Sequence, residues 1–359
     1  MIKNTVYHTR KGKMFYLGNA LLDISAECDS SILEKYKLKA DDNSEYGHEQ
    51  VGLFEELCNK SVMLTPGGSA QNSARISQWL LQGLGSKTVA FTGCIGNDSY
   101  GRLLEEKLKA SQVITEYQYH PSLPTGVSAG IVTSDGKRTL CARLGAAEQF
   151  SPEHLKCERV KRVLQKAEYV YVEGFFLSHS PGVVYDLAKN THENNKKFVL
   201  NLSATYICEC NFSDIMNCMP YIDLLFGNDS EARAFGHHLN LTITSVSDIA
   251  KQIALLPKMD SDSPRVVVIT RGTEPLIVAQ SSSSQCLEYP VPRVAKIGDT
   301  IGAGDSFVAG FLSALLFDAT LEEAVKCGLY AASEIVKQRG CTLPDSPPDA
   351  SVFNFVSKL

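Results

Sequence analysis

The chain has 359 residues, of which 44% are hydrophobic and 21% are charged. This composition supplies enough apolar side chains for a large core and excludes disorder over most of the chain, while the length allows two domains or one large α/β domain with an appendage. The net charge of −5 shows no basic excess, so the composition does not favour a nucleic-acid partner.

The 11 cysteines are an odd number and lie scattered along the chain. Residues 1–13 are polar and contain no apolar run of the kind found in secretory leaders. We therefore expect reduced thiols and a cytoplasmic protein. The longest apolar run, residues 307–317, has 11 residues, whereas a bilayer-spanning helix needs about 20. We expect no membrane partner.

Short runs of β-branched and aromatic residues alternate with segments of helical length. The runs are continuously apolar, which favours strands that are covered on both faces. In chain order we predict a strand at 14–18, a helix at 69–82, a strand at 88–93, a helix at 99–111, a strand at 169–173, a helix at 181–194, strands at 198–202 and 222–226, a helix at 245–256, a strand at 266–270 and a helix at 321–338. This alternation predicts the α/β class, with a parallel sheet and helices on both faces.

Two stretches, 21–65 and 117–144, interrupt this alternation with weaker patterns. Within the second, residues 126–132 and 139–144 flank an Asp135-Gly136 turn, which predicts a hairpin. We interpret the two stretches as one small sheet that covers the main domain. The predicted division is a large α/β domain of 1–20, 66–116 and 145–359, with a small, discontinuous, β-rich lid of 21–65 and 117–144.

The most informative segment is GDTIGAGDSF at residues 298–307, directly before an apolar helix. Gly302, Ala303 and Gly304 leave backbone N–H groups accessible at a helix N-terminus, which binds anions through its unpaired donors and its dipole. A carboxylate at Asp305 would repel a phosphate unless it takes a proton from the attacking hydroxyl. At an ordinary pKa of about 3.9 it would be ionised at pH 7. Alternatively, Asp305 only interacts with the helix dipole.

Other nucleotide and metal motifs are absent. Residues 83–88, GLGSKT, resemble part of a Walker A motif, but the order of residues differs and Leu80 replaces the first glycine. The chain contains no G-x-G-x-x-G and no H-E-x-x-H. A dinucleotide-dependent oxidoreductase and a zinc protease therefore lose their main support.

The segment DTIGAGD at 299–305 resembles the C-terminal signature of the ribokinase-like (PfkB) carbohydrate kinases, and GGSAQN at 67–72 resembles a second signature of that family. Residues 18–25, 93–96, 173–177, 201–204, 225–228 and 340–342 resemble its adenosine-phosphorylating members. The resemblance implies a Rossmann-like α/β fold with a small lid. It also implies a monomer that transfers the γ-phosphoryl group of ATP, with Mg²⁺, to the 5′-hydroxyl of adenosine.

By this resemblance, Asp305 is the general base, and the N–H groups of Ile301, Gly302, Ala303 and Gly304 stabilise the phosphoryl oxygens. Arg138 reaches the ATP phosphates from the lid. The ATP side of the site also includes Asn228, Glu231, Thr270 and Gly272, with Glu231 acting on Mg²⁺ through water. Two alternatives stay open: Arg138 as a solvated surface residue, and Asn228 as a helix cap with Glu231 at the third helical position.

Asp23 resembles the residue that accepts hydrogen bonds from both vicinal ribose hydroxyls. The remaining nucleoside-binding residues that the resemblance implies are Asn19, Gly68, Ser69, Asn72, Ser128, Leu140, Ala142, Leu144, Phe175 and Asn201, with Tyr206 and Phe307 as weaker candidates. Phe175 would stack on the base. From the residues alone, an exposed turn residue is the favoured interpretation of Asp23, and core packing is a competing interpretation of Leu140 and Ala142.

One position and one segment depart from the family pattern. Ile301 stands where mammalian adenosine-phosphorylating members carry Asn, and residues 42–45 are more polar than their counterpart, which points to altered analogue preference. A sugar kinase would use the same Asp305 and anion site. A non-catalytic nucleotide-binding protein would be expected to lack Asp305.

Overall fold

The computed structural model describes residues 13–40, 43–84, 87–133, 138–242, 245–260 and 262–353. Its largest feature is a nine-stranded sheet with the order β16-β15-β14-β13-β12-β11-β1-β5-β7. The strands are β1 (Met14–Leu17), β5 (Val89–Thr92), β7 (Ile114–Thr115), β11 (Tyr169–Glu173), β12 (Lys197–Asn201), β13 (Ile222–Asn228), β14 (Val266–Arg271), β15 (Glu274–Gln280) and β16 (Leu287–Tyr289). From β14 to β7 neighbouring strands are parallel, whereas β15 and β16 add an antiparallel edge. The predicted α/β sheet is confirmed and extended by this edge.

Helices cover both faces of this sheet, so its strands are buried on two sides. One face packs against α3 (Ser69–Leu80), α4 (Ser99–Ala110), α12 (Ala303–Leu315) and α13 (Leu321–Ile335). The other packs against α5 (Pro152–Leu155), α6 (Glu158–Lys166), α7 (Pro181–Glu193), α8 (Thr205–Cys210), α9 (Phe212–Cys218), α10 (Asp229–His238) and α11 (Val246–Ala254). In β1, Met14 and Tyr16 join the first core, and Phe15 and Leu17 join the second. This alternation explains why the strands read as continuous apolar runs.

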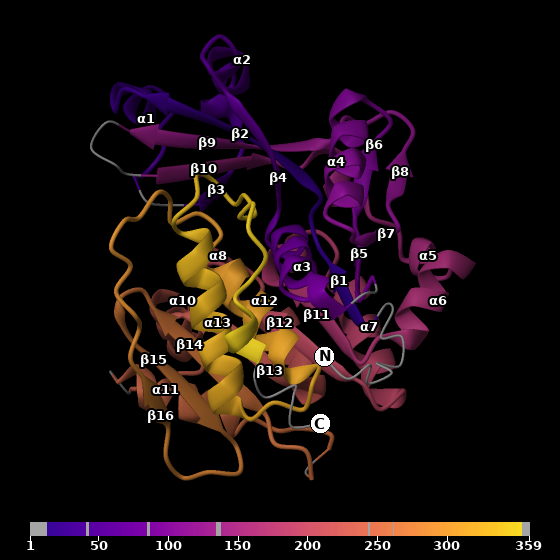
Figure 1. The fold of residues 1–359 in the computed structure, drawn as a ribbon, viewed down its shortest axis with the longest axis vertical. Coiled ribbons are helices and arrows are strands. Elements are labelled where there is room, and N and C mark those ends of the chain that lie inside the picture. Colours follow the sequence, from indigo (N-terminus) through magenta and orange to yellow (C-terminus); the bar gives the residue numbers. More distant parts are fainter. Residues whose placement is uncertain are drawn as a thin grey trace, which may run out of the picture.

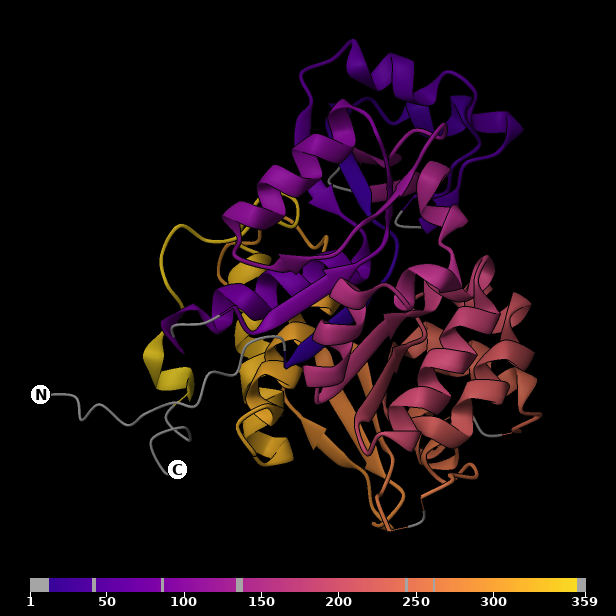
Figure 2. The same cartoon turned by 90° about the vertical axis from the view of Figure 1, so that its right-hand side faces the viewer.

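A second sheet of five strands has the order β3-β10-β9-β2-β4. It contains β2 (Leu21–Cys28), β3 (Asn43–Glu45), β4 (Met63–Gly67), β9 (Gly126–Thr133) and β10 (Arg138–Arg143), with α1 (Ser31–Lys35) and α2 (Leu53–Cys58) packed on it. Figures 1 and 2 show this sheet at the top of the molecule, above the nine-stranded sheet. β9 and β10 pair as antiparallel strands; the Asp135-Gly136 turn of the predicted hairpin lies outside the described residues.

The segment around residue 118 belongs to neither large sheet. β8 (Gln118–His120) pairs in parallel with β6 (Cys94–Gly96) as a separate two-stranded sheet. Short 3-10 helices complete the fold: η1 (His48–Gln50), η2 (Gln82–Leu84), η3 (Gly145–Gln149), η4 (Gly174–Ser178) and η5 (Met219–Tyr221). Among the described residues, no helix is long and apolar enough to cross a membrane.

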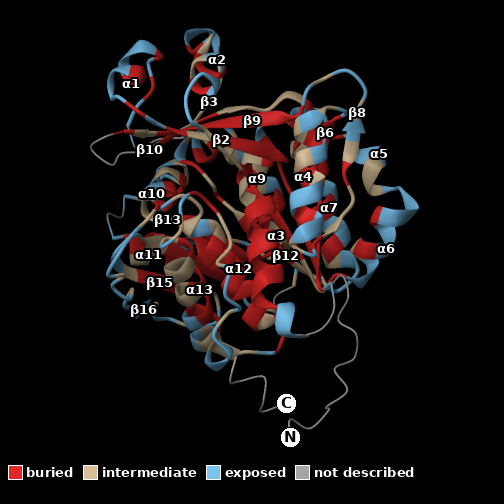
Figure 3. Cartoon of the chain, turned by 45° about the horizontal axis from the view of Figure 1, so that its top comes forward, coloured by how far each residue is buried: buried red, intermediate tan, exposed pale blue. Residues whose placement is uncertain are grey.

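Helix α3 lies in the middle of the molecule, and its residues from Ala70 to Leu80 are all buried (Figure 3). Its buried polar side chains are tied to the strands around it. Gln78 accepts hydrogen bonds from the N–H groups of Thr88 and Val89, and Ser77 shares one with the Tyr16 hydroxyl. These bonds fix the C-terminal part of α3 relative to the nine-stranded sheet.

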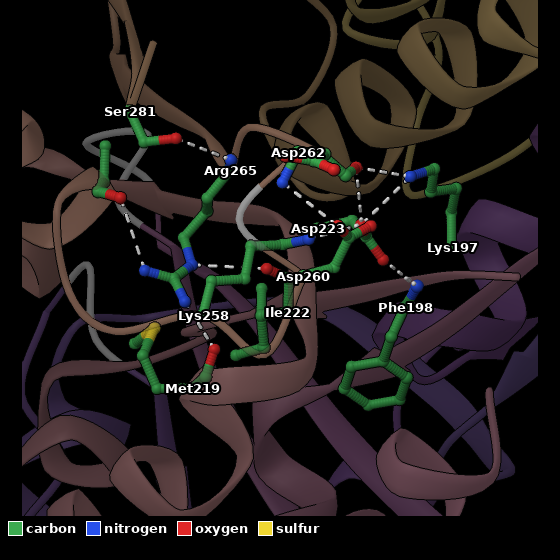
Figure 4. A network of polar contacts seen from close by, with 12 residues as sticks. Lys197, Phe198, Met219, Ile222, Asp223, Lys258, Asp260, Asp262, Arg265 and Ser281 are labelled. Atoms are coloured by element: carbon green, nitrogen blue, oxygen red, sulfur yellow. Dashed lines mark hydrogen bonds and ion pairs between the residues drawn. The ribbon is translucent and has the colours of Figure 1, made fainter. Parts of the chain in front are cut away.

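A second polar cluster lies at the start of β14 (Figure 4). The guanidinium of Arg265, which is fully buried, donates to the carbonyl oxygens of Met219, Ile222, Ile253, Ala254, Leu256 and Pro257. Nearby, Asp223 accepts from the Phe198 N–H at 2.9 Å and forms ion pairs with Lys197 and Lys258 at 3.2 and 3.1 Å. This cluster joins the amino ends of β12, β13 and β14.

Candidate active site

A cavity of about 390 Å³ lies where the carboxyl ends of the parallel strands face the five-stranded sheet. Asn19 follows β1, and Glu173, Asn201 and Asn228 are the last residues of β11, β12 and β13. All four line the cavity. This edge is the usual ligand-binding edge of an open α/β sheet.

The loop before α12 is held by Asp299, which is buried. Its Oδ1 accepts from the Ile301 N–H at 2.8 Å, and its Oδ2 accepts from the Gly340 N–H at 2.7 Å. Gly302 then adopts a left-handed conformation with φ of +80°, and a Cβ there would lie 2.5 Å from the Cys341 Sγ. Both the conformation and the close packing therefore require glycine at this position.

This local structure narrows the set of anion-binding donors. The Ile301 N–H is already paired with Asp299, and the Ala303 N–H donates to the Thr300 carbonyl oxygen at 3.2 Å. Within the described part of the chain, the N–H groups of Gly302 and Gly304 make no hydrogen bond. Of the four predicted donors, these two are available to a ligand at the N-terminus of α12.

Asp305 lies in the first turn of α12 and lines the cavity. Ser69 Oγ donates to its Oδ1 at 2.7 Å, and Asn72 Nδ2 donates to its Oδ2 at 3.1 Å. Burial raises the pKa of this carboxyl to about 6, although the bonds from Ser69 and Asn72 oppose the change. The ordinary aspartate pKa assumed from the sequence is therefore too low. At neutral pH the group is an ionised carboxylate that accepts a proton more readily than an exposed one.

Asp23 is buried on β2, and the strand register places it in one row with Ser128 of β9 and Ala142 of β10. Burial, with a smaller contribution from the charge of Asp305, raises the Asp23 pKa to about 7, while Arg75 opposes the change. A Cβ at Gly67 would overlap the Asp23 carboxylate at 1.9 Å. The glycine therefore makes room for a buried carboxyl, not for an exposed turn residue.

The five-stranded sheet supplies an apolar wall. Leu140 and Ala142 of β10 line the cavity, whereas Thr139 and Cys141, which alternate with them along the strand, are buried on the other face. Opposite, the ring centroids of Phe175 and Tyr206 lie 6.2 Å apart, and the Tyr206 hydroxyl donates to Glu45 Oε1 at 3.4 Å. This end of the cavity is suited to a flat, largely apolar ring system.

At the far end of the cavity, Asn228 and Glu231 form a reciprocal cap on α10. Asn228 Oδ1 accepts from the Glu231 N–H at 2.9 Å, and Glu231 Oε2 accepts from the Asn228 N–H at 3.0 Å. Burial raises the Glu231 pKa to about 7. The capping alternative thus describes the local structure, and both residues also line the cavity.

The residues here suit a loosely held Mg²⁺ and not a caged metal. Among the described residues, no group of three or more His, Cys, Asp or Glu side chains could hold a metal ion. Glu231 and Thr270 both line this end of the cavity, and Glu231 contributes the carboxylate. Mg²⁺ commonly keeps several waters and takes its other ligands from substrate phosphates, so one carboxylate acting through water fits its chemistry.

The family model described as pfkB family carbohydrate kinase matches residues 54–348. The chain belongs to this family. It is 37% identical to adenosine kinase 1 of Arabidopsis thaliana over 340 residues, which cover 94% of this chain and 97% of that protein.

The solved structures that are similar to this chain include adenosine kinases. The structure of Anopheles gambiae adenosine kinase in complex with P1,P4-di(adenosine-5) tetraphosphate has a TM-score of 0.89 and 37% identity, covering 94% of this chain and 99% of that one. The structure of Schistosoma mansoni adenosine kinase in complex with adenosine and AMP has a TM-score of 0.87 and 31% identity, covering 93% and 98% of the two chains. The ribokinase-like fold is thereby shown, and this pfkB-family chain is a kinase with ATP as co-substrate.

The structure of this kinase brings most of the predicted site residues together around one cavity. These are Asn19, Asp23, Gly68, Ser69, Asn72, Ser128, Leu140, Ala142, Leu144, Phe175, Asn201, Asn228, Glu231, Thr270, Ile301, Gly302, Ala303, Gly304 and Asp305, with Tyr206 and Phe307. Gly272 lies in the turn after β14 with φ of +60° and is not among the described residues that line the cavity.

Two other predictions concern groups that lie partly outside the described residues. Arg138 begins β10 opposite Val132, and its side chain lies outside the described part of the structure. Asp42 of the polar 42–45 segment also lies outside the described residues, whereas Ser44 and Glu45 line the cavity. Sequence reasoning assigned no role to Glu173 or Ser203, which also line it. For Glu173 a usable signal existed, because it ends a predicted strand at the same sheet edge as Asn201.

Proposed function

We propose that this chain phosphorylates adenosine at its 5′-hydroxyl, with ATP as donor, giving AMP and ADP. The observation that carries the proposal is the buried Asp305 carboxylate in the first turn of α12, beside the unpaired N–H groups of Gly302 and Gly304. A proton acceptor and an anion site are the two groups that phosphoryl transfer to a hydroxyl needs. The similarity to adenosine kinases along nearly the whole chain supports adenosine as the acceptor.

In this mechanism Asp305 takes the proton of the 5′-hydroxyl as its oxygen attacks the γ-phosphorus. The N–H groups of Gly302 and Gly304 hold the phosphoryl oxygens, where negative charge accumulates during transfer. Ser69 and Asn72 fix the rotamer of Asp305 through their hydrogen bonds. The protein thus contributes positioning and charge stabilisation, which dominate catalysis of this reaction class.

The nucleoside would bind between the two sheets. Asp23 accepts from the 2′- and 3′-hydroxyls, and these two donors favour its ionised form despite the raised pKa near 7. Leu140, Ala142 and Phe175 form the slot for the adenine ring. The remaining predicted nucleoside contacts are Asn19, Gly68, Ser69, Asn72, Ser128, Leu144 and Asn201.

ATP would enter from the side of Asn228, Glu231 and Thr270, and Gly272 would border it at the end of β14. Mg²⁺, when bound, neutralises charge on the ATP phosphates, and Glu231 is the residue that would hold it through water.

The proposal also assigns a lid role to residues 21–65 and 117–144, which would cover a large domain of residues 1–20, 66–116 and 145–359. The placement of β2, β9 and β10 over the cavity supports this role, and Arg138 would reach the phosphates from the lid. A cytoplasmic monomer that binds no nucleic acid completes the proposal.

The test is an ADP-release assay with adenosine, guanosine, ribose and 2′-deoxyadenosine, with product identity checked by mass. We expect adenosine to have the highest kcat/KM and AMP to be the product. A preference for ribose would identify a sugar kinase instead and refute the proposal. We expect weaker activity on 2′-deoxyadenosine, because one Asp23 contact would be lost.

A further inference from the structure

Glu173 is a completely buried carboxyl at the end of β11, and no role in the proposed reaction uses it. Its Oε1 accepts from the Asn19 N–H and its Oε2 from the Ala70 N–H, both at 2.6 Å. Asn19 follows β1, and Ala70 lies in the first turn of α3. A Cβ at Gly18 would lie 2.6 Å from this carboxyl, so glycine there permits the contact. One side chain thus joins a strand end to a helix start at the cavity wall.

His179 holds the other end of Asn19. Its Nε2 lies 2.9 Å from Asn19 Oδ1, and its Nδ1 lies 2.9 Å from Ser180 Oγ. Its ring packs edge-on against Phe176 at 4.7 Å between centroids. Burial lowers the His179 pKa to about 4, so the ring is neutral at pH 7. Because Oδ1 is an acceptor, the proton lies on Nε2, and Nδ1 accepts from the Ser180 hydroxyl.

These contacts leave Nδ2 as the side-chain atom of Asn19 that is available to a ligand. Its N–H is taken by Glu173 and its Oδ1 by His179. Within the described residues its Nδ2 makes no hydrogen bond, and Asn19 lines the cavity beside Gly68 and Asp23. An amide fixed in this orientation presents two donors and no acceptor to the nucleoside site.

We propose that Glu173 and His179 are positioning residues that fix Asn19 as a hydrogen-bond donor to the nucleoside. This inference rests on the proposed function, since it deepens the recognition of the same acceptor substrate. It requires an acceptor atom on the nucleoside opposite Asn19 Nδ2. Without His179, the Asn19 amide could rotate and present its oxygen to that acceptor, so the nucleoside would bind less tightly.

The test compares His179→Leu, which removes the donor at similar volume, with His179→Gln, which keeps an N–H donor. We expect His179→Leu to raise KM for adenosine about tenfold, with KM for ATP changed less than about twofold, and His179→Gln to restore KM to within about threefold. His154→Leu is the matched control. His154 also bonds a carbonyl oxygen, that of Glu116 at 2.8 Å, and packs edge-on against Phe150 at 5.6 Å. Unlike Asn19, neither Glu116 nor Phe150 is among the described residues that line the cavity. It should leave KM for adenosine unchanged.

A double-mutant cycle with Asn19→Ala shows whether His179 acts through Asn19. In the Asn19→Ala background, His179→Leu should raise KM for adenosine no further. An additive rise, or an unchanged KM in His179→Leu alone, would overturn the proposal. Failure of the proposed function shows separately, in the wild-type chain, as absence of adenosine phosphorylation.

Nitrogen-15 NMR of labelled histidine tests the contact without substrate or activity. We expect His179 to be a neutral Nε2–H tautomer from pH 6 to pH 8, and its Nε2 signal to shift in Asn19→Ala but not in His154→Leu. A proton on Nδ1, or a signal that Asn19→Ala leaves unchanged, would overturn the proposed clamp.

Discussion

Replacing Asp305 by Asn separates the proposed catalytic role of this carboxyl from its cost to stability. Asparagine matches the shape of aspartate. Its Oδ1 can accept from Asn72 while its Nδ2 donates to Ser69, whose hydroxyl can reverse direction. We expect the fold to persist and phosphoryl transfer to fall by about 10²–10⁴-fold, the range typical of losing a general base.

The same substitution should stabilise the protein at neutral pH. The folded-state pKa of Asp305 is raised from 3.8 to about 6, and one pKa unit is worth about 1.4 kcal/mol, so ionising this buried group costs about 3 kcal/mol. The protein keeps its full stability below the unfolded-state pKa of this carboxyl, where the group is protonated in both states. It loses stability as the pH rises through the folded-state pKa of about 6. Asp305→Asn should therefore gain about 3 kcal/mol at pH 7.5 and under about 1 kcal/mol at pH 4.

Urea unfolding of both proteins at pH 7.5 and pH 4, with activity measured on the same preparations, checks this expectation. The charge of Asp305 also raises the pKa values of Asp23 and Glu173, so its removal should add to the gain at neutral pH. Equal stabilities at both pH values would refute the burial argument. Near wild-type turnover would refute Asp305 as the base.

Three further outcomes are expected. First, kcat should fall on the acid side with a slope of one below about pH 6, because protonated Asp305 accepts no proton, and a profile that stays flat to pH 5 would contradict this. Second, Gly302→Ala should lower kcat at least tenfold, since the left-handed backbone and the Cys341 Sγ both oppose a Cβ, and unchanged kinetics would show that the loop geometry is not required. Third, Arg265→Met should lower the free energy of unfolding by about 3 kcal/mol or more, because six carbonyl oxygens lose a donor. Its KM and kcat at 20 °C should stay close to wild type, and a stable but inactive variant would contradict a purely structural role.

The amino-acid sequence alone determined the main secondary structure and the loop before α12. The strand predicted at 169–173 is β11 (Tyr169–Glu173), and the helix predicted at 181–194 is α7 (Pro181–Glu193). Buried parallel strands are short apolar runs between turns, a pattern that is local in the sequence. The helix start at Gly302 to Asp305 could be predicted for the same reason, because a glycine-rich helix start is formed by a few consecutive residues.

Only the tertiary structure decided which groups in the cavity remain available and how they titrate. The pairing of the Ile301 N–H with Asp299, the raised pKa of Asp305 and the clamp of Glu173 and His179 on Asn19 have no local signal. Glu173 and Asn19 are 154 positions apart in the chain. Burial and long-range contacts set the charge and orientation of these groups, and both arise only when the two sheets and α3 come together. The net charge of −5 therefore indicates little about this site, because the unpaired N–H groups at the start of α12 carry no formal charge.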